Sequence, residues 1–212
     1  MNPMRVVVLI SGRGTNLDAL LKASGLYEVV AVISNRPDAN GLKLAEKAGI
    51  ATTVVNHKDY AQRADFDHKL ADVISNINPK LIVLAGFMRV LGQQFVEQFT
   101  GRLINIHPSL LPEFRGLNTH ERALVAGVKE HGASVHFVTA ELDGGPVIAQ
   151  IALPVGLDDT AQTLAKKLLP LEHQLLTSVV HWCSEGRMSY EQGAIYFDGK
   201  RLLEPLRLKP NA

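Results

Sequence analysis

Residues 5–16 read RVVVLISGRGTN, and this stretch decides the fold. Residues 5–10 are β-branched and apolar on both faces, which is typical of a buried parallel strand. A glycine-rich turn follows at residues 11–15, and residues 16–23 then carry the leucine spacing of a helix. A strand, a glycine turn and a helix in this order predict the first unit of an α/β sheet.

The same alternation continues through the first half of the chain. We expect further strands at residues 29–34, 52–55, 81–85 and 103–107, and helices at residues 42–48 and 65–77. This order predicts an α/β fold with a mostly parallel twisted sheet, a Rossmann-like N-terminal half and helices on both faces. In such sheets ligands bind beyond the carboxyl ends of the strands. Those ends are residues 11–16, residues 86–91 and the segment after residue 106.

The second half has a different pattern. A long loop at residues 108–117 precedes a short helix at 118–126, strands at 134–138 and 147–154, and an amphipathic helix at 161–182. Pro170 is expected to kink that helix or to begin a second segment. Small strands are expected in residues 188–201, around a turn at Asp198-Gly199. We predict one domain over residues 1–212, with halves at 1–100 and 101–212.

Composition narrows the class of protein. The 212 residues contain 22 Lys and Arg against 21 Asp and Glu, a net charge of +1, which disfavours non-specific nucleic-acid binding. The single cysteine, Cys183, excludes a disulfide framework. The N-terminal residues lack the pattern of a signal peptide, and no apolar run has the length of a membrane span. These features predict a cytoplasmic protein with neither a nucleic-acid nor a membrane partner.

The turn at residues 12–16 has the outline of a phosphate site. Gly14, Thr15 and Asn16 stand where glycines let a backbone approach an anion and where a helix N-terminus offers free N–H groups. Leu17 replaces the third glycine of a dinucleotide fingerprint, and the turn lacks the lysine of a P-loop. A plain strand-to-helix turn remains an equal alternative for this motif alone.

Three polar residues form a candidate catalytic set. Asn105 and His107 alternate along one strand, so their side chains point to the same side. An amide and a protonated imidazole that converge could stabilise an oxyanion. Asp143, in a glycine-rich turn, could pair with His107 and raise its pKa. The alternative is a capped strand end and an ordinary turn aspartate. His131 and His136 do not have zinc-ligand spacing, so we predict no metal.

Four separated stretches together resemble the folate-dependent formyltransferases. They are LISGRGTNL, VLAGFMRVL, INIHPSLLP and HGASVHFVTAELDGGPVI, in this order along nearly the whole chain. The resemblance implies transfer of the formyl group of 10-formyltetrahydrofolate, a co-substrate, to the amine of glycinamide ribonucleotide, in de novo purine (IMP) synthesis. It implies no metal, small-molecule partners, and a monomer or weak homodimer.

The resemblance also assigns residues. It makes Asn105, His107 and Asp143 catalytic, with Asp143 keeping His107 protonated. For glycinamide ribonucleotide it implies Gly14, Thr15, Asn16 and, at the ribose, Glu172. For the folate it implies Arg63, Met88, Arg89, Val90, Leu91, Asn105, Thr139, Ala140, Glu141, Leu142 and Asp143. Residues 1–100 would then form the phosphate-binding half, and residues 101–212 the catalytic and folate-binding half.

Four other functions compete with this assignment. A formyltetrahydrofolate hydrolase shares the catalytic set but has an additional N-terminal domain, and a methionyl-tRNA formyltransferase adds a C-terminal domain. The strand that begins at Arg5 and the short tail after Trp182 disfavour both. A folate- or nucleotide-binding module without activity is disfavoured by the complete catalytic set, and a nicotinamide dehydrogenase by Leu17.

Overall fold

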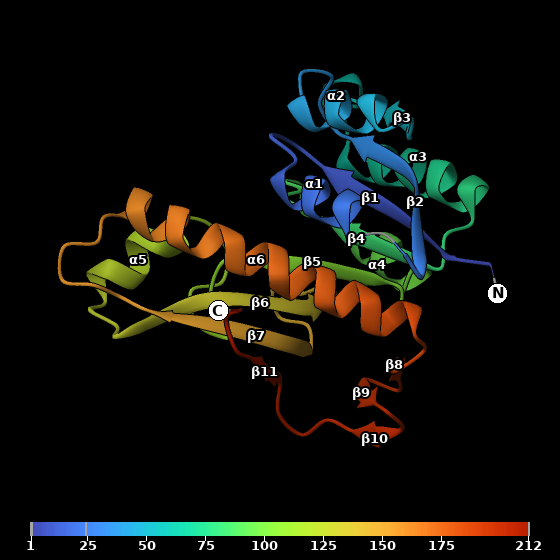
Figure 1. Ribbon diagram of the computed structural model, residues 1–212. Coiled ribbons are helices and arrows are strands. Elements are labelled where there is room, and N and C mark those ends of the chain that lie inside the picture. Colours follow the sequence, from blue (N-terminus) through green and yellow to red (C-terminus); the bar gives the residue numbers. More distant parts are fainter. Residues whose placement is uncertain (1, 24, 212) are drawn as a thin grey trace. The chain divides into compact units, whose positions relative to one another are not determined.

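A computed structural model describes residues 2–23 and 25–211. These residues form two compact units, one that extends to Asn105 and one that begins at Ile106. Figure 1 labels their helices and strands. The expectation of a single domain with a division near residue 100 stays a prediction. Each unit is described below by itself.

The first unit is built on a parallel sheet. Its strands are β1 (Met4–Ile10), β2 (Tyr27–Ser34), β3 (Ala51–Val54), β4 (Leu81–Leu84) and the first residues of β5 (Leu103–His107). They lie in the order β5-β4-β1-β2-β3, and every neighbouring pair is parallel. All five residues from Val6 to Ile10 are fully buried. The apolar run that decided the fold is therefore a buried parallel strand, as predicted, and it lies between β4 and β2.

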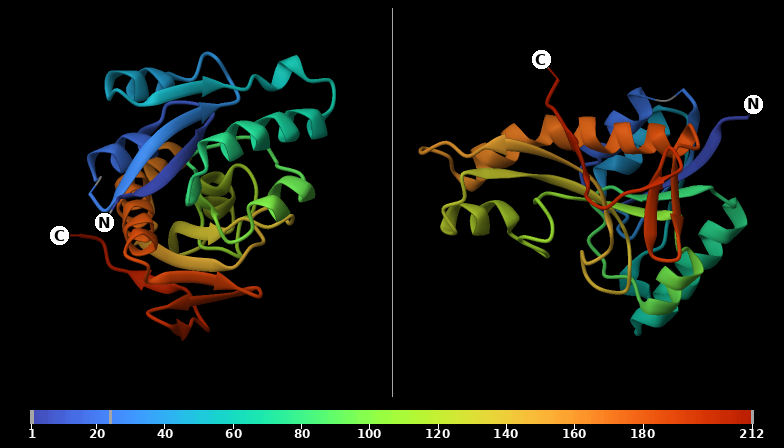
Figure 2. Two further views of the ribbon diagram at one scale, coloured as in Figure 1. Left: turned by 90° about the vertical axis from the view of Figure 1, so that its right-hand side faces the viewer. Right: turned by 90° about the horizontal axis from the view of Figure 1, so that it is seen from below.

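Helices cover both faces of this sheet. They are α1 (Thr15–Lys22), α2 (Asn40–Lys47), α3 (Arg63–Ile77) and α4 (Gln93–Gln98), with a short 3-10 turn, η1 (His57–Asp59). In Figure 2, α1 and α2 lie on one face, and α3 and α4 lie on the other. The reversal follows from right-handed crossovers that run outward to β3 and then back to β4. The sequence did not predict η1 or α4.

The second unit combines helices with strands of two sheets. In one sheet, β6 (Glu130–Phe137) pairs antiparallel with β7 (Val147–Pro154), and β7 pairs parallel with β11 (Leu206–Leu208). The helix α6 (Ala161–Ser184) packs along β6 and β7, and α5 (Thr119–Val125) contacts α6. The other sheet is antiparallel and contains β8 (Met188–Glu191), β9 (Ala194–Phe197) and β10 (Lys200–Arg201).

Two expectations about the second half were wrong: a second segment that begins at Pro170, and a strand that begins at residue 134. Pro170 does not begin a second segment, because α6 is continuous over 24 residues, while the expected kink stays a prediction. Pro170 is exposed, so the carbonyl that loses its N–H partner can meet water, while buried leucines before and after it hold the helix. The strand expected from residue 134 begins four residues earlier, at Glu130. A Cβ on Gly132 would lie 2.1 Å from the carbonyl oxygen of Ile151, so the close pairing of β6 with β7 needs this glycine.

Candidate active site

The glycine turn of the first unit leads directly into α1. Gly14 is the N-cap of α1 with φ +79°, and a Cβ there would lie 2.7 Å from the Cα of Gly41. The N–H of Gly41 donates to the carbonyl of Gly12 at 3.0 Å, which fixes the turn against α2. Gly14 has no side chain to cap the helix, so the first turn, with Thr15 and Asn16, has no side-chain cap. The positive end of the helix dipole lies at this turn, which suits an anion.

The segment at residues 88–91 follows β4 at the same edge of the sheet. The side chains of Met88 and Val90 are 68% and 49% exposed, while Leu91 is buried and Arg89 is half-buried. The backbone N–H of Met88 donates to the hydroxyl of Ser11 at 2.7 Å. This bond joins the segment to the end of β1. Exposed apolar side chains on an anchored segment suit one wall of a site for a flat ring.

Arg63 is the first residue of α3, and its side chain is exposed. It lines a surface hollow between α3 and the start of α4, together with Asp67, His68, Gly92 and Gln93. The hollow is polar, and Arg63 can meet an acidic ligand there. An exposed arginine at the start of a helix is also common without any ligand, so its position alone does not assign Arg63 a function.

Asn105 and His107 both lie on β5, as predicted. Asn105 is half-buried and is paired in register with Leu84 of β4. His107 is buried, and its Nε2 donates to the carbonyl of Phe114 at 3.0 Å. A carbonyl only accepts hydrogen bonds, so Nε2 carries a hydrogen and Nδ1 is the atom that titrates.

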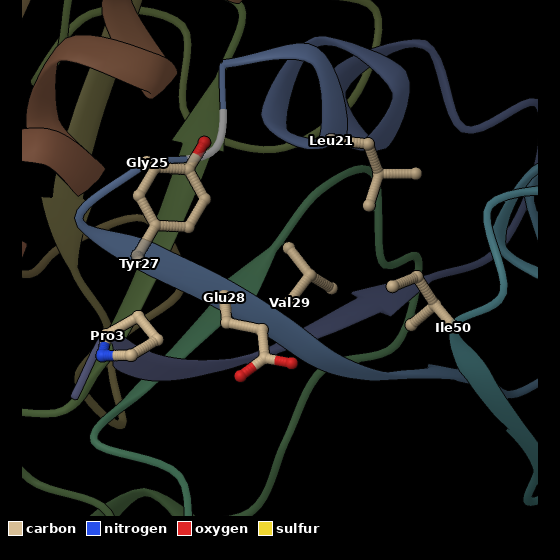
Figure 3. Close-up of a pocket in the computed structure, with 7 residues that line it drawn as sticks. All are labelled: Pro3, Leu21, Gly25, Tyr27, Glu28, Val29 and Ile50. Atoms are coloured by element: carbon tan, nitrogen blue, oxygen red, sulfur yellow. The ribbon is translucent and has the colours of Figure 1, made fainter.

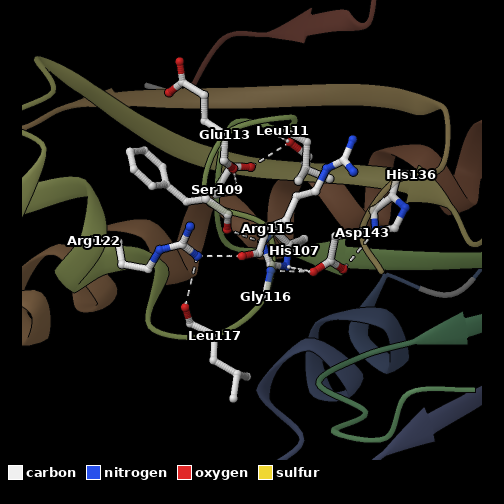
Figure 4. Close-up of polar contacts among 12 residues, drawn as sticks. His107, Ser109, Leu111, Glu113, Arg115, Gly116, Leu117, Arg122, His136 and Asp143 are labelled. Carbon is white, nitrogen blue, oxygen red and sulfur yellow. Dashed lines mark hydrogen bonds and ion pairs between the residues drawn. The ribbon is translucent and has the colours of Figure 1, made fainter. Parts of the chain in front are cut away.

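Asp143 faces His107 from the loop between β6 and β7 (Figure 4). Its Oδ2 lies 3.4 Å from Nδ1 of His107 and accepts a hydrogen bond from the N–H of Gly116 at 2.9 Å. Its other oxygen, Oδ1, lies 3.6 Å from Nε2 of His136. Asp143 adopts φ +48°, a backbone conformation that costs free energy for a residue other than glycine. The surrounding loop must therefore hold it in place.

Glycine residues and polar contacts fix the conformation of the loop between β6 and β7. A Cβ on Gly145 would lie 1.8 Å from the carbonyl oxygen of Phe137, so this position needs glycine. Glu141 forms an ion pair with Arg115 of the loop after β5, and Leu142 is exposed. The hydroxyl of Thr139 donates to the carbonyl of Glu141 at 3.4 Å. These contacts restrain the segment that contains Ala140 and directly precedes Asp143.

The loop after β5 is held by its own hydrogen bonds. The hydroxyl of Ser109 donates to the carbonyl of Glu113 at 2.6 Å, and Nη1 of Arg122 donates to the carbonyl of Arg115 at 2.5 Å. These bonds restrain the loop that carries the carbonyl of Phe114, which contacts His107, and the N–H of Gly116, which contacts Asp143. The loop that sequence reasoning left without structure therefore orients the candidate catalytic pair.

The charges of the pair differ from the sequence expectation. Burial lowers the pKa of His107 below 6.5, and the hydrogen bond to Phe114 and the charge of Asp143, which raise it, do not compensate. Burial alone would raise the pKa of Asp143, but the polar contact with His136, the hydrogen bond from Gly116 and the charge of His107 bring it below its ordinary value. Asp143 is therefore ionised near neutral pH. The expectation that Asp143 keeps His107 protonated was wrong in its net direction.

His136 is a functional candidate that the sequence reasoning passed over as structural or pocket-lining. It is buried on β6, and its Nδ1 donates to the carbonyl of Phe137 at 2.9 Å, so Nε2 faces Asp143. The signal was the alternation along this strand, which places His136 on the same face as Ser134. Glu172, the predicted ribose ligand, is half-buried in α6, two residues after Pro170.

A separate hollow in the first unit has no such chemistry (Figure 3). Its lining comes from the residue before β1, from the beginning of β2 and the turn that precedes it, from α1 and from the residue before β3. Parallel sheets bind ligands at the opposite, carboxyl ends of their strands. The glycine turn and residues 88–91 are therefore the stronger candidates for a ligand site.

Within residues 2–23 and 25–211, no helix is long and apolar enough to cross a membrane, and no three His, Cys, Asp or Glu side chains are grouped to hold a metal ion.

Comparison with known proteins decides the family. The sequence pattern of the family described as formyl transferase matches residues 4–180. The chain belongs to the formyl transferase family. It is 45% identical over 203 residues to the phosphoribosylglycinamide formyltransferase of Escherichia coli K12, with 94% of this chain and 96% of that protein covered. The α/β fold with a mostly parallel sheet agrees with this family.

Two further relatives extend the comparison. The solved structure of a phosphoribosylglycinamide formyltransferase from Coxiella burnetii has a TM-score of 0.94 and 49% identity, and covers 97% of this chain and 99% of that one. The trifunctional purine biosynthetic protein adenosine-3 of Gallus gallus is 44% identical over 87% of this chain, which spans 19% of that larger protein. Sequences similar to this chain therefore occur both as proteins of nearly the same length and as parts of longer proteins.

Proposed function

We propose that the chain transfers the formyl group of 10-formyltetrahydrofolate to the amine of glycinamide ribonucleotide, a step of de novo purine synthesis. The observation that carries this proposal is the pairing of buried His107 with the largely buried Asp143, with the histidine on the strand that also carries Asn105. Membership of the formyl transferase family supports the reaction type. Relatives of nearly the same length that act on phosphoribosylglycinamide support the acceptor.

The residues suit this chemistry. The amine nitrogen attacks the formyl carbon, and the carbonyl oxygen becomes an oxyanion in a tetrahedral intermediate. The amide of Asn105 and an N–H of protonated His107 donate to that oxyanion, which replaces Phe114 as the acceptor on His107. The bond between the formyl carbon and N10 of the folate then breaks. The attacking nitrogen loses one proton and N10 gains one, through His107 or a bound water.

Asp143 gives the site its charge balance. It is ionised, so it stabilises the imidazolium of His107 when that forms during the proton transfer. The lowered pKa of His107 means that the free protein holds mostly the neutral ring near pH 7. During the transfer the ring takes up a proton at Nδ1, beside Asp143, so that Nε2 can give its proton to the leaving nitrogen and take one from the attacking amine. The pair then acts as a proton shuttle, with Asp143 opposing the cost of burying the charge.

The binding residues divide between the two substrates. For glycinamide ribonucleotide, the turn with Gly14, Thr15 and Asn16 would take the phosphate, and Glu172 the ribose hydroxyls. For the folate, we assign the wall at residues 88–91, Arg63 and the loop at residues 139–143. No metal takes part in this scheme, and a monomer or weak homodimer in the cytoplasm suffices for it.

Folate deformylation, followed by absorbance with and without glycinamide ribonucleotide, tests the proposal. Turnover that requires the ribonucleotide supports the transferase. Turnover that proceeds without it indicates a formyltetrahydrofolate hydrolase, and binding without turnover in either case indicates a binding module or another acceptor. A rise in melting temperature with each substrate separately would show which of them the protein binds.

A further inference from the structure

The segment at residues 88–91 is tied at both ends by side chains that the proposed reaction does not use. At its start, the N–H of Met88 donates to Oγ of Ser11 at 2.7 Å. Just past its end, the N–H of Gly92 donates to Oδ2 of Asp67 at 2.8 Å. Both acceptors are buried, Asp67 to the point of 4% exposure. A segment with exposed apolar side chains thus has a fixed backbone.

Asp67 is an unusual residue for its position. It lies on α3, where buried positions otherwise carry apolar side chains such as Phe66 and Leu70. Within the described part of the chain, its Oδ1 has no hydrogen-bond partner, and its Oδ2 accepts the hydrogen bond from Gly92. Burial raises its pKa, and the nearby positive charges of Arg63 and Arg89 oppose that rise. A carboxyl group buried at this cost calls for a reason other than packing.

Gly92 supplies the matching half of the contact. Its φ of −75° suits any residue, so backbone conformation does not require glycine there. A Cβ at this position would lie 2.8 Å from Oδ2 of Asp67. Gly92 is also the N-cap of α4, which begins at Gln93. Asp67 therefore fixes both the end of residues 88–91 and the start of the next helix.

Ser11 is oriented as firmly at the other end. Its hydroxyl donates to Oδ1 of Asn35 at 2.5 Å, which directs a lone pair toward the N–H of Met88. Its own N–H donates to the carbonyl of Gly86 at 3.2 Å. Ser11 also directly precedes the glycine turn at residues 12–16, so a change there can affect both proposed substrate sites. Asp67 belongs to α3 instead, and it gives the cleaner test.

We propose that Asp67 is a positioning residue for the formylfolate site: by accepting the hydrogen bond from Gly92 it holds residues 88–91 in the conformation that binds the folate, while Ser11 holds the other end. This inference rests on the proposed function. Without the acceptor on Asp67, the segment samples other conformations and only a fraction of molecules is ready to bind. The apparent affinity for the folate falls by that fraction, whereas the site for the ribonucleotide is not altered.

Steady-state kinetics with each substrate varied in turn test the proposal on the full-length protein. For Asp67→Ala we expect KM for 10-formyltetrahydrofolate to rise about tenfold, with kcat and KM for glycinamide ribonucleotide within about threefold of the parent values. Asp67→Asn keeps an oxygen acceptor for Gly92 and should keep KM for the folate within about threefold. The exposed Asp65, two residues earlier on the same helix, provides the matched control as Asp65→Ala.

The outcomes separate cleanly. An Asp67→Ala protein with an unchanged KM for the folate, or with both KM values raised equally, overturns the proposal. So does an Asp67→Asn protein as impaired as Asp67→Ala, since the charge and not the acceptor would then matter. If Asp67→Ala does not fold, Gly92→Ala, which crowds the same oxygen, must raise KM for the folate selectively. An unmodified protein that shows no formyl transfer would instead refute the proposed function.

Discussion

Acidification should destabilise this protein through one buried histidine, and the size of the effect follows from the structure. His131 is buried on β6, and its Nε2 lies 3.0 Å from Nδ1 of His120. Burial, followed by the positive charges that His120 and His107 can carry, lowers the pKa of His131 from 6.5 to about 4. The folded protein therefore resists protonation of His131, whereas the unfolded chain takes up the proton near pH 6.5.

The sign and magnitude follow from that difference. Because the unfolded state binds more protons below pH 6.5, the free energy of unfolding falls as the pH falls toward 4. Between pH 8 and pH 5, the lowered pKa of His131 accounts for a loss of about 2 kcal/mol, and below pH 4 for about 3 kcal/mol in all. Carboxylates and the other histidines add their own pH dependence, so the measurement has to isolate His131.

His131→Gln isolates it, because glutamine keeps a donor for His120 and cannot be protonated. Urea unfolding at pH 8 and pH 5 should show the loss of unfolding free energy reduced by about 2 kcal/mol in this variant relative to the parent protein. Val135→Ala, a buried residue of the same strand, is the control: it should lower stability at both pH values without changing their difference. An equal pH dependence in His131→Gln and the parent protein would refute the assignment.

Three further predictions concern the site. Asn105→Ala and His107→Ala should each lower kcat about 10²- to 10³-fold in the folate deformylation assay. Near-normal turnover in either variant would show that its side chain does not stabilise the oxyanion. In Asp143→Asn, loss of the negative charge should lower the pKa of His107 further. The acid limb of the pH–rate profile, which reports the titration of His107, should then move to lower pH; an unmoved acid limb would contradict the pairing. Gly145→Ala should cost about 1–3 kcal/mol of unfolding free energy in urea titrations, because its Cβ would overlap the carbonyl of Phe137; an unchanged midpoint would show that the loop can move aside.

Most of the sheet could be predicted from local sequence. The strands around Val6 and Leu81 are continuous apolar runs, and such runs are buried wherever they pair. The short helix α4 was missed because its six residues carry only two buried side chains, Phe95 and Val96, too few for a visible period. The start of β6 was missed because Gly132 indicates a turn in isolation. In the folded chain that glycine lets a neighbouring strand approach, which is a property of the pairing.

The candidate site divides in the same way. The order of motifs identified His107 and Asp143, and the structure places their side chains beside each other. The contribution of His136 depends on which face of β6 turns toward Asp143, and the acceptor on Asp67 depends on where α4 begins. The direction of the pKa of His107 could not be predicted either, because it is decided by the extent of burial relative to one nearby charge. The roles of the individual site residues stay predictions.

Transfer of an isotopically labelled formyl group tests the central claim most directly. The protein is given 10-formyltetrahydrofolate labelled in the formyl carbon together with glycinamide ribonucleotide. The products are then separated, and the labelled species are identified and quantified by mass spectrometry. The account predicts that the label appears in formylated ribonucleotide in the same amount as tetrahydrofolate is formed, and that little is released as formate. Label recovered as formate, with the ribonucleotide unchanged, would contradict it.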